Sequence, residues 1–173
     1  MVSMTVDRRP AIPAEWEPHV ACWLSAAVRE EDFRDRTAEA RAQLDAVIRE
    51  IARHEPVRLL VWEGEIAAVR SRLSDPALEI EFVPALVDDI WMRDIAPTVG
   101  VTGGARAAID WHFSNWDGSA RGARPGDRLA EREERLFGRR VRAPIKAEGG
   151  APSSPAVFET KRASVSRPPP PTG

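Results

Sequence analysis

The chain has 173 residues with 25 basic and 27 acidic side chains, so its formal net charge at pH 7 is only −2. Acids and bases are interspersed, which excludes the basic stripe of a nucleic-acid-binding protein and the polybasic patch of a membrane-binding one. Its apolar runs are far shorter than the ~20 residues that span a bilayer. The first residues lack the apolar core of a signal peptide, and a single cysteine suits a reducing compartment, so we expect a cytoplasmic protein with one domain.

Strands and helices are expected to alternate along the first half of the chain. Apolar residues recur at helical spacing between residues 30 and 54, with charged residues on the opposite face. Leu78, Ile80 and Phe82 alternate with glutamates, which is typical of a half-buried strand. The expected elements are a strand at 21–25, a helix at 30–54, a strand at 57–62, a helix at 63–73 and a strand at 78–83.

The pattern continues in the second half with a hairpin. Its strands lie within residues 96–111, and Gly103-Gly104 supplies the turn. A helix at 127–137 and a strand at 140–145 follow. This order of strands and helices fits repeated strand-strand-helix-strand modules.

The segment DDIWMRD at residues 88–94 carries the chemistry of a site for a planar cation. A guanidinium has five N–H donors in one plane, so it binds carboxylates in that plane and an aromatic ring above it. Asp88, Asp89, Trp91 and Asp94 offer these groups. The alternative is a polar loop that is stabilised by its own hydrogen bonds and by an Arg93–Asp94 ion pair.

Four motifs in this order resemble the agmatine deiminase family, the bacterial-type arginine and agmatine deiminases of the guanidine-modifying superfamily. The motifs are IPAEWEPH at 12–19, DDIWMRD at 88–94, DWHFSNW at 110–116 and AEGG at 147–150. The resemblance implies a pentein-type α/β propeller with five modules, of which this chain would hold about two ββαβ-like modules and the start of a third. The edges of such a partial propeller would be exposed, so self-association is expected.

The resemblance also implies hydrolytic deimination of a guanidinium substrate without a cofactor or metal. Agmatine would yield N-carbamoylputrescine and ammonia, a step toward putrescine; a peptidyl arginine is the alternative substrate. Asp94 and Glu148 match the two catalytic carboxylates of the family, and Asp88, Asp89 and Trp91 are candidate substrate contacts. Trp111 and Trp116 are expected in the core or the channel wall.

Cys22 does not fit the nucleophile that this chemistry requires. It lies in an expected apolar strand between Ala21 and Trp23, and burial among apolar groups raises a thiol pKa and makes the thiol inert. No spacing of His, Cys and acidic residues indicates a metal site.

After Gly150 the sequence changes character. Residues 151–173 show neither strand alternation nor a helical stripe and include four consecutive prolines. Residues 1–150 are therefore expected to form the deiminase portion, and 151–173 either a tail read out of frame or a disordered segment. The family's His-x-Asp and Gly-rich Cys motifs are not found, so we expect these 173 residues alone to bind a guanidinium at most, without turnover.

Overall fold

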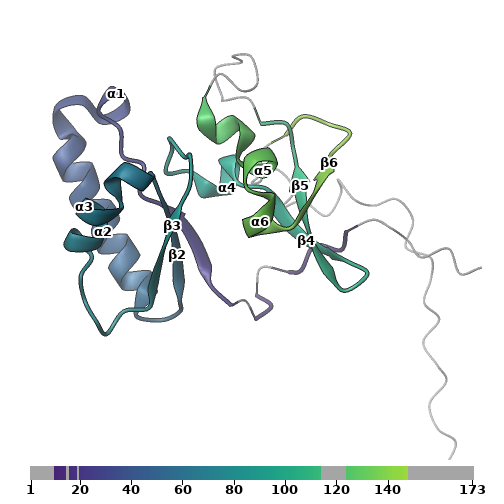
Figure 1. Ribbon diagram of the computed structural model, residues 1–173, viewed down its shortest axis with the longest axis horizontal. Helices are drawn as coiled ribbons and strands as arrows, with labels where there is room; N and C mark the ends of the chain where they lie inside the picture. Colours follow the sequence, from purple (N-terminus) through teal and green to yellow (C-terminus); the bar gives the residue numbers. More distant parts are fainter. Residues whose placement is uncertain (1–9, 15, 19, 114–123, 148–173) are drawn as a thin grey trace, which may run out of the picture.

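The computed structural model describes residues 10–14, 16–18, 20–113 and 124–147, which form two small sheets with helices (Figure 1). The sheets have the strand orders β1-β2-β3 and β4-β5-β6. The first half contains β1 (Cys22–Ser25), α1 (Glu30–Phe33), η1 (Arg34–Arg36), α2 (Thr37–Ala52), β2 (Val57–Val61), η2 (Glu63–Glu65), α3 (Ile66–Arg72) and β3 (Ile80–Pro84). The second half contains α4 (Met92–Ile95), β4 (Thr98–Thr102), β5 (Ala105–Asp110), η3 (Pro125–Arg128), α5 (Leu129–Arg132), α6 (Glu134–Phe137) and β6 (Arg139–Arg142).

The first sheet is parallel and is buried on both faces. Its central strand β2 pairs with β1 and β3, so the sheet edges fall on the two outer strands. Val57, Leu59 and Val61 pack against α2 and α3, while Leu60 points into a second cluster on the opposite face. This burial on both faces explains the continuous apolar run of β2.

The second sheet begins with the expected hairpin. β4 and β5 are antiparallel, and the turn residues Gly103 and Gly104 have φ values of 58° and 80°. Such values favour glycine and match the backbone twist of a tight hairpin. β6 then joins β5 in parallel. Ala11 forms an isolated antiparallel bridge with Val101 at the outer edge of β4.

Two of the three helices expected from the sequence, at 30–54 and 127–137, are interrupted. The first is broken at Arg34, whose φ of 51° ends α1, and Thr37 Oγ1 donates a hydrogen bond to the Arg34 carbonyl at 2.6 Å where α2 begins. The second is divided into η3, α5 and α6, with Glu133 between the last two. The Glu133 side chain is buried and pairs with Arg135 at 3.1 Å. A local backbone turn and a buried charge thus override the helical periodicity.

The order ββαβ is found in the second half only. There β4 and β5 form the hairpin, the short helices follow, and β6 returns in parallel. The described first half has the order β-α-β-α-β with parallel strands, which departs from the expected module. The α/β class is therefore observed, while the five-module propeller remains a prediction.

One apolar cluster joins the two sheets. It contains Leu60 and Val83 from the first sheet, Ala108 from the second, and Phe137 from α6. Phe137 is 2% exposed, and its ring centroid lies 4.9 Å from that of Trp23. In Figure 1 the helices α4, α5 and α6 lie beside this junction, whereas α2 and α3 cover the far face of the first sheet. Among the described residues, no helix is long and apolar enough to cross a membrane.

Phe137→Ala tests whether this junction holds the two sheets together. The substitution should lower the free energy of unfolding by about 3–5 kcal/mol in urea denaturation, because it leaves a cavity at a fully buried site. Val47→Ala is the control, since Val47 is 51% exposed on α2 and alanine is a good helix former. The control should change stability by less than about 0.5 kcal/mol. Equal effects of the two changes would show that the sheets do not depend on this contact.

Candidate functional site

The candidate site follows β3 at the junction between the sheets. Ala85 and Val87 are buried and Leu86 is 44% exposed, so strand-like alternation continues beyond Pro84 as far as Val87. Asp88 breaks this alternation, because it is buried directly after the buried Val87. Met92 and Ile95, three positions apart on α4, are buried in the joint core. This anchoring leaves the intervening Asp94 half-buried rather than inside the core.

Asp88 is a buried carboxylate that accepts hydrogen bonds from two separate segments of the chain. Its side chain is 3% exposed. Oδ2 accepts from Arg124 Nε at 2.9 Å and from Arg29 Nη1 at 3.2 Å. Oδ1 accepts from the Gly126 amide at 2.7 Å, and the Asp88 carbonyl accepts from Arg124 Nη2 at 3.3 Å. Two guanidinium groups and an amide thus compensate the cost of burying this charge.

Gly126 is required by this close approach. A Cβ atom at position 126 would lie 2.8 Å from Asp88 Oδ1 and 3.5 Å from Ile95 Cγ2. The first distance is shorter than ordinary van der Waals contact, so a larger residue would displace the carboxylate. Gly126 therefore allows the backbone to donate directly to Asp88.

Asp89 lies in a different environment from its neighbour. Its side chain is 13% exposed, and Oδ2 lies 3.7 Å from Arg124 Nη1. Oδ1 accepts from the Trp91 amide at 3.3 Å. Burial raises the pKa of Asp89 above its ordinary value, against the opposing effects of these hydrogen bonds and of the Arg124 charge. The charged form of Asp89 is therefore disfavoured in the fold, which is common at functional sites.

Trp91 and Asp94 border the exposed side of the same segment. The Trp91 side chain is 58% exposed, which is unusual for an indole and leaves a ring face accessible. The Trp91 carbonyl accepts from the Asp94 amide at 2.9 Å and begins α4. Asp94 lines a cavity of about 10 Å³, roughly the space of one water molecule.

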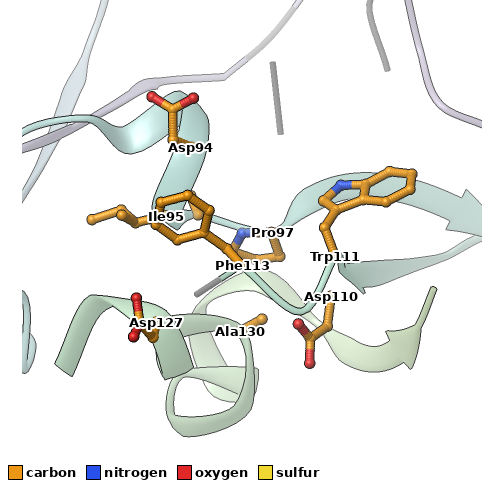
Figure 2. Close-up of a pocket in the computed structure, with 9 residues that line it drawn as sticks. Asp94, Ile95, Pro97, Asp110, Trp111, Phe113, Asp127 and Ala130 are labelled. Atoms are coloured by element: carbon orange, nitrogen blue, oxygen red, sulfur yellow. The ribbon is translucent and has the colours of Figure 1, made fainter. Parts of the chain in front are cut away.

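Asp110 and Asp127 also line this cavity, and Figure 2 shows that the Asp94 carboxylate points away from both of them. Asp110 pairs with Arg140 at 2.7 Å and accepts from the His112 amide at 2.9 Å. Asp127 accepts from the Arg124 amide at 3.3 Å. Trp111, 3% exposed, donates from Nε1 to Thr98 Oγ1 at 2.8 Å, as expected for a core aromatic residue. The described site is therefore concentrated on residues 88–94.

The predicted site residues separate into three groups. Asp89, Trp91 and Asp94 lie together on the segment between β3 and β4, and Asp88 is turned inward toward its arginine partners. Glu148 and Trp116 lie outside the described residues. The contributions of Arg29, Arg124 and Gly126 were missed, because they lie 59, 36 and 38 positions from Asp88 and form no local motif with it.

Cys22 lies in β1, apart from these residues, and is half-buried. Burial raises the pKa of its thiol, and the charge of Glu55 raises it further. Both effects disfavour the thiolate, which agrees with the expectation that Cys22 is not a nucleophile. In the part of the chain that the structure describes, no group of three His, Cys, Asp or Glu side chains could hold a metal ion.

The structure defines an α/β protein with carboxylates grouped after β3 at the junction of two small sheets. The chain matches the Porphyromonas-type peptidyl-arginine deiminase family over residues 11–154 and belongs to it. It is 38% identical over 109 residues to an agmatine deiminase of Stutzerimonas stutzeri, which is 62% of this chain and 29% of that protein. It is 36% identical over 108 residues to an agmatine deiminase of Ectopseudomonas mendocina, with the same coverage of 62% and 29%.

Solved structures show the same fold. An agmatine deiminase of Enterococcus faecalis superposes with a TM-score of 0.70 at 23% identity. The superposition covers 82% of this chain and 40% of the E. faecalis protein. This chain therefore spans less than half the length of the relatives to which it is similar.

Asp88 and Asp89 should respond in opposite ways to neutralisation. Asp88→Asn should lower the free energy of unfolding by about 3 kcal/mol, because two partly buried guanidinium groups lose the buried carboxylate that pairs with both. Asp89→Asn should leave stability at pH 7 unchanged or higher, because it removes a charge that burial disfavours.

The raised pKa of Asp89 also predicts how the stability of wild type and of Asp89→Asn depends on pH. A raised folded-state pKa means that protonation favours the fold, so wild type loses stability relative to Asp89→Asn as the pH rises through that pKa. The difference between the two proteins should vanish below the ordinary Asp pKa of about 3.9. Urea denaturation between about pH 3 and pH 7 measures it. If wild type is more stable than Asp89→Asn at pH 7, the conclusion that burial disfavours the Asp89 charge is wrong.

Proposed function

We propose that residues 88–94 form part of a guanidinium-binding site, and that the protein catalyses hydrolytic deimination of agmatine to N-carbamoylputrescine and ammonia. The observation that carries the proposal is the grouping of Asp89, exposed Trp91 and half-buried Asp94 on one segment in a chain of the deiminase family. The agmatine deiminases among its relatives support the choice of substrate.

Each group has a defined role in the proposed site. Asp94 accepts two N–H groups of the substrate guanidinium, and such charge-assisted pairs are about twice as strong as neutral hydrogen bonds. The exposed Trp91 ring provides a face for the same planar cation. Asp89 is an anion whose charge the fold disfavours, so an added cation gains by approaching it. Glu148 is proposed as the second carboxylate, on the resemblance alone.

The reaction requires groups beyond these carboxylates. A cysteine thiolate attacks the guanidinium carbon, and the tetrahedral intermediate loses ammonia once a histidine has protonated the leaving nitrogen. Water then attacks the thiouronium carbon, releasing the thiolate and the ureido product. The carboxylates hold the substrate nitrogens and favour positive charge at the carbon that the thiolate, and later water, attacks. Cys22 is the single cysteine of the chain, and its environment does not suit this role, so the nucleophile is not assigned here.

A peptidyl arginine is the second candidate substrate. The family that matches residues 11–154 is described by that activity. The guanidinium end of both substrates is the same, so residues 88–94 would bind either. The two substrates differ in the part distant from the guanidinium, and a competition between agmatine and a short arginyl peptide would rank them.

Binding by the chain itself is tested with agmatine and tryptophan fluorescence. We expect a saturable change that is lost in Trp91→Leu and kept in Trp62→Leu, because Trp62 is 46% exposed but lies at the end of β2. We expect no ureido product from these 173 residues above the buffer background. A change of equal size in both variants would place agmatine elsewhere, and product formation would assign a nucleophile within the chain.

Asp94→Asn tests the carboxylate that grips the substrate. The amide keeps the shape but presents N–H donors toward those of the guanidinium. Agmatine affinity, and kcat/KM wherever turnover is measured, should fall at least about a hundredfold, or ~3 kcal/mol. The melting temperature should change little. Near-normal binding with a large loss of stability would instead assign Asp94 to the structure of the loop.

A further inference from the structure

Arg124 brings the chain's own guanidinium into the acidic segment. Its Nε lies 2.9 Å from Asp88 Oδ2, its Nη2 lies 3.3 Å from Asp32 Oδ2, and its Nη1 lies 3.7 Å from Asp89 Oδ2. The side chain is 24% exposed. One planar cation therefore spans three carboxylates from α1 and from the segment after β3.

We propose that Arg124 is a positioning residue of the guanidinium site, which orients Asp88 and Asp89 and thereby holds the backbone that carries Trp91 and Asp94. The inference rests on the proposed function for the identity of the site. It adds a residue that no local motif indicates, since Arg124 lies 36 positions from Asp88.

The hydrogen bonds assign the orientation of the segment to Arg124 more than to Arg29. Arg29 contributes one hydrogen bond to Asp88, at 3.2 Å, and also pairs with Glu31. Arg124 bonds both the side chain and the carbonyl of Asp88 and approaches Asp89 with a third nitrogen. Only a guanidinium fork makes these contacts together, because a lysine ammonium is a single point charge.

The charges around Asp89 leave it available to a second cation. Asp88 is compensated by Arg29 and Arg124, whereas Arg124 also faces Asp32 from α1. Asp32 opposes ionisation of Asp89 and Arg124 favours it. Among the described residues these are the charged groups that face Asp89, together with its neighbour Asp88. Arg124 thus opposes the rise in the Asp89 pKa that burial causes, while it also pairs with Asp88 and Asp32.

Three variants distinguish the hydrogen bonds of the Arg124 guanidinium from its positive charge. Arg124→Gln removes both the charge and the fork, and Arg124→Lys keeps the charge alone. Arg128→Gln is the matched control, because Arg128 follows in η3, is 42% exposed and pairs with Glu131 instead of the acidic segment. If Arg124→Gln does not fold, Arg124→Lys is compared with Arg128→Gln instead.

The first measurement needs no ligand. Amide hydrogen exchange of residues 85–95 should accelerate at least about tenfold in Arg124→Gln and less in Arg124→Lys, with no change in Arg128→Gln. Equal exchange in Arg124→Gln and Arg128→Gln would overturn the proposal, since the segment would then hold its position without Arg124.

The second measurement is agmatine affinity as a function of pH, followed by tryptophan fluorescence. Loss of the Arg124 charge raises the pKa of Asp89 further, so binding by Arg124→Gln should fail at a higher pH than binding by wild type and be at least about tenfold weaker at pH 7. Arg124→Lys should keep the wild-type pH profile but bind more weakly. If Arg124→Gln binds agmatine more weakly than wild type but with the same pH dependence, Arg124 does not act through Asp89. That result would overturn the proposal.

Failure of the inference and failure of the proposed function are distinct results. If wild type binds no agmatine at any pH, the proposed function fails, and hydrogen exchange alone decides whether Arg124 holds the segment. If wild type binds and Arg124→Gln binds equally well with the same profile, the function stands and the positioning role of Arg124 is wrong.

Discussion

The buried carboxylate of Asp88 is the constraint on which the site depends. A charge that is 3% exposed is costly to bury unless it is paired, and here Arg29, Arg124 and the Gly126 amide supply the compensation. These donors come from the connection after β1 and from the turn that opens η3. The backbone of residues 88–94 is therefore placed by contacts between distant segments, since α4 itself has only four residues.

Asp88 and Asp89 show how adjacent identical residues can serve different purposes. Hydrogen bonds from Arg29, Arg124 and the Gly126 amide hold the Asp88 carboxylate inside the protein, against the strand-like alternation after Pro84. The Asp89 carboxylate has fewer donors and a raised pKa. The first carboxylate contributes to the fold because its charge is compensated. The second opposes the fold slightly and gains from a cation, which is the balance that a binding site for a charged substrate needs.

The sequence predicted the elements that depend on local periodicity. The alternation of Ile80 and Phe82 and the Gly103-Gly104 turn correspond to β3 and to the β4–β5 hairpin. The break at Arg34 was not predictable, because it depends on a positive φ at a residue that normally favours helix. The motif at 88–94 located the candidate site, but the inward turn of Asp88 depends on arginines distant in sequence. Local patterns encode the elements, and long-range ion pairs decide how the site is oriented.

Holding a guanidinium and attacking it make different demands on a protein. Binding needs carboxylates on a backbone that is held in place, and the ion pairs of Asp88 hold residues 88–94 at the junction of the two sheets. Attack needs a thiolate, which is favoured beside cations or a helix N-terminus and disfavoured in the half-buried strand position of Cys22, close to the charge of Glu55. The part of the family fold described here therefore contains the electrostatic half of the proposed chemistry. Because these carboxylates and the Cys22 thiol have such different surroundings, the proposed binding can be tested apart from turnover.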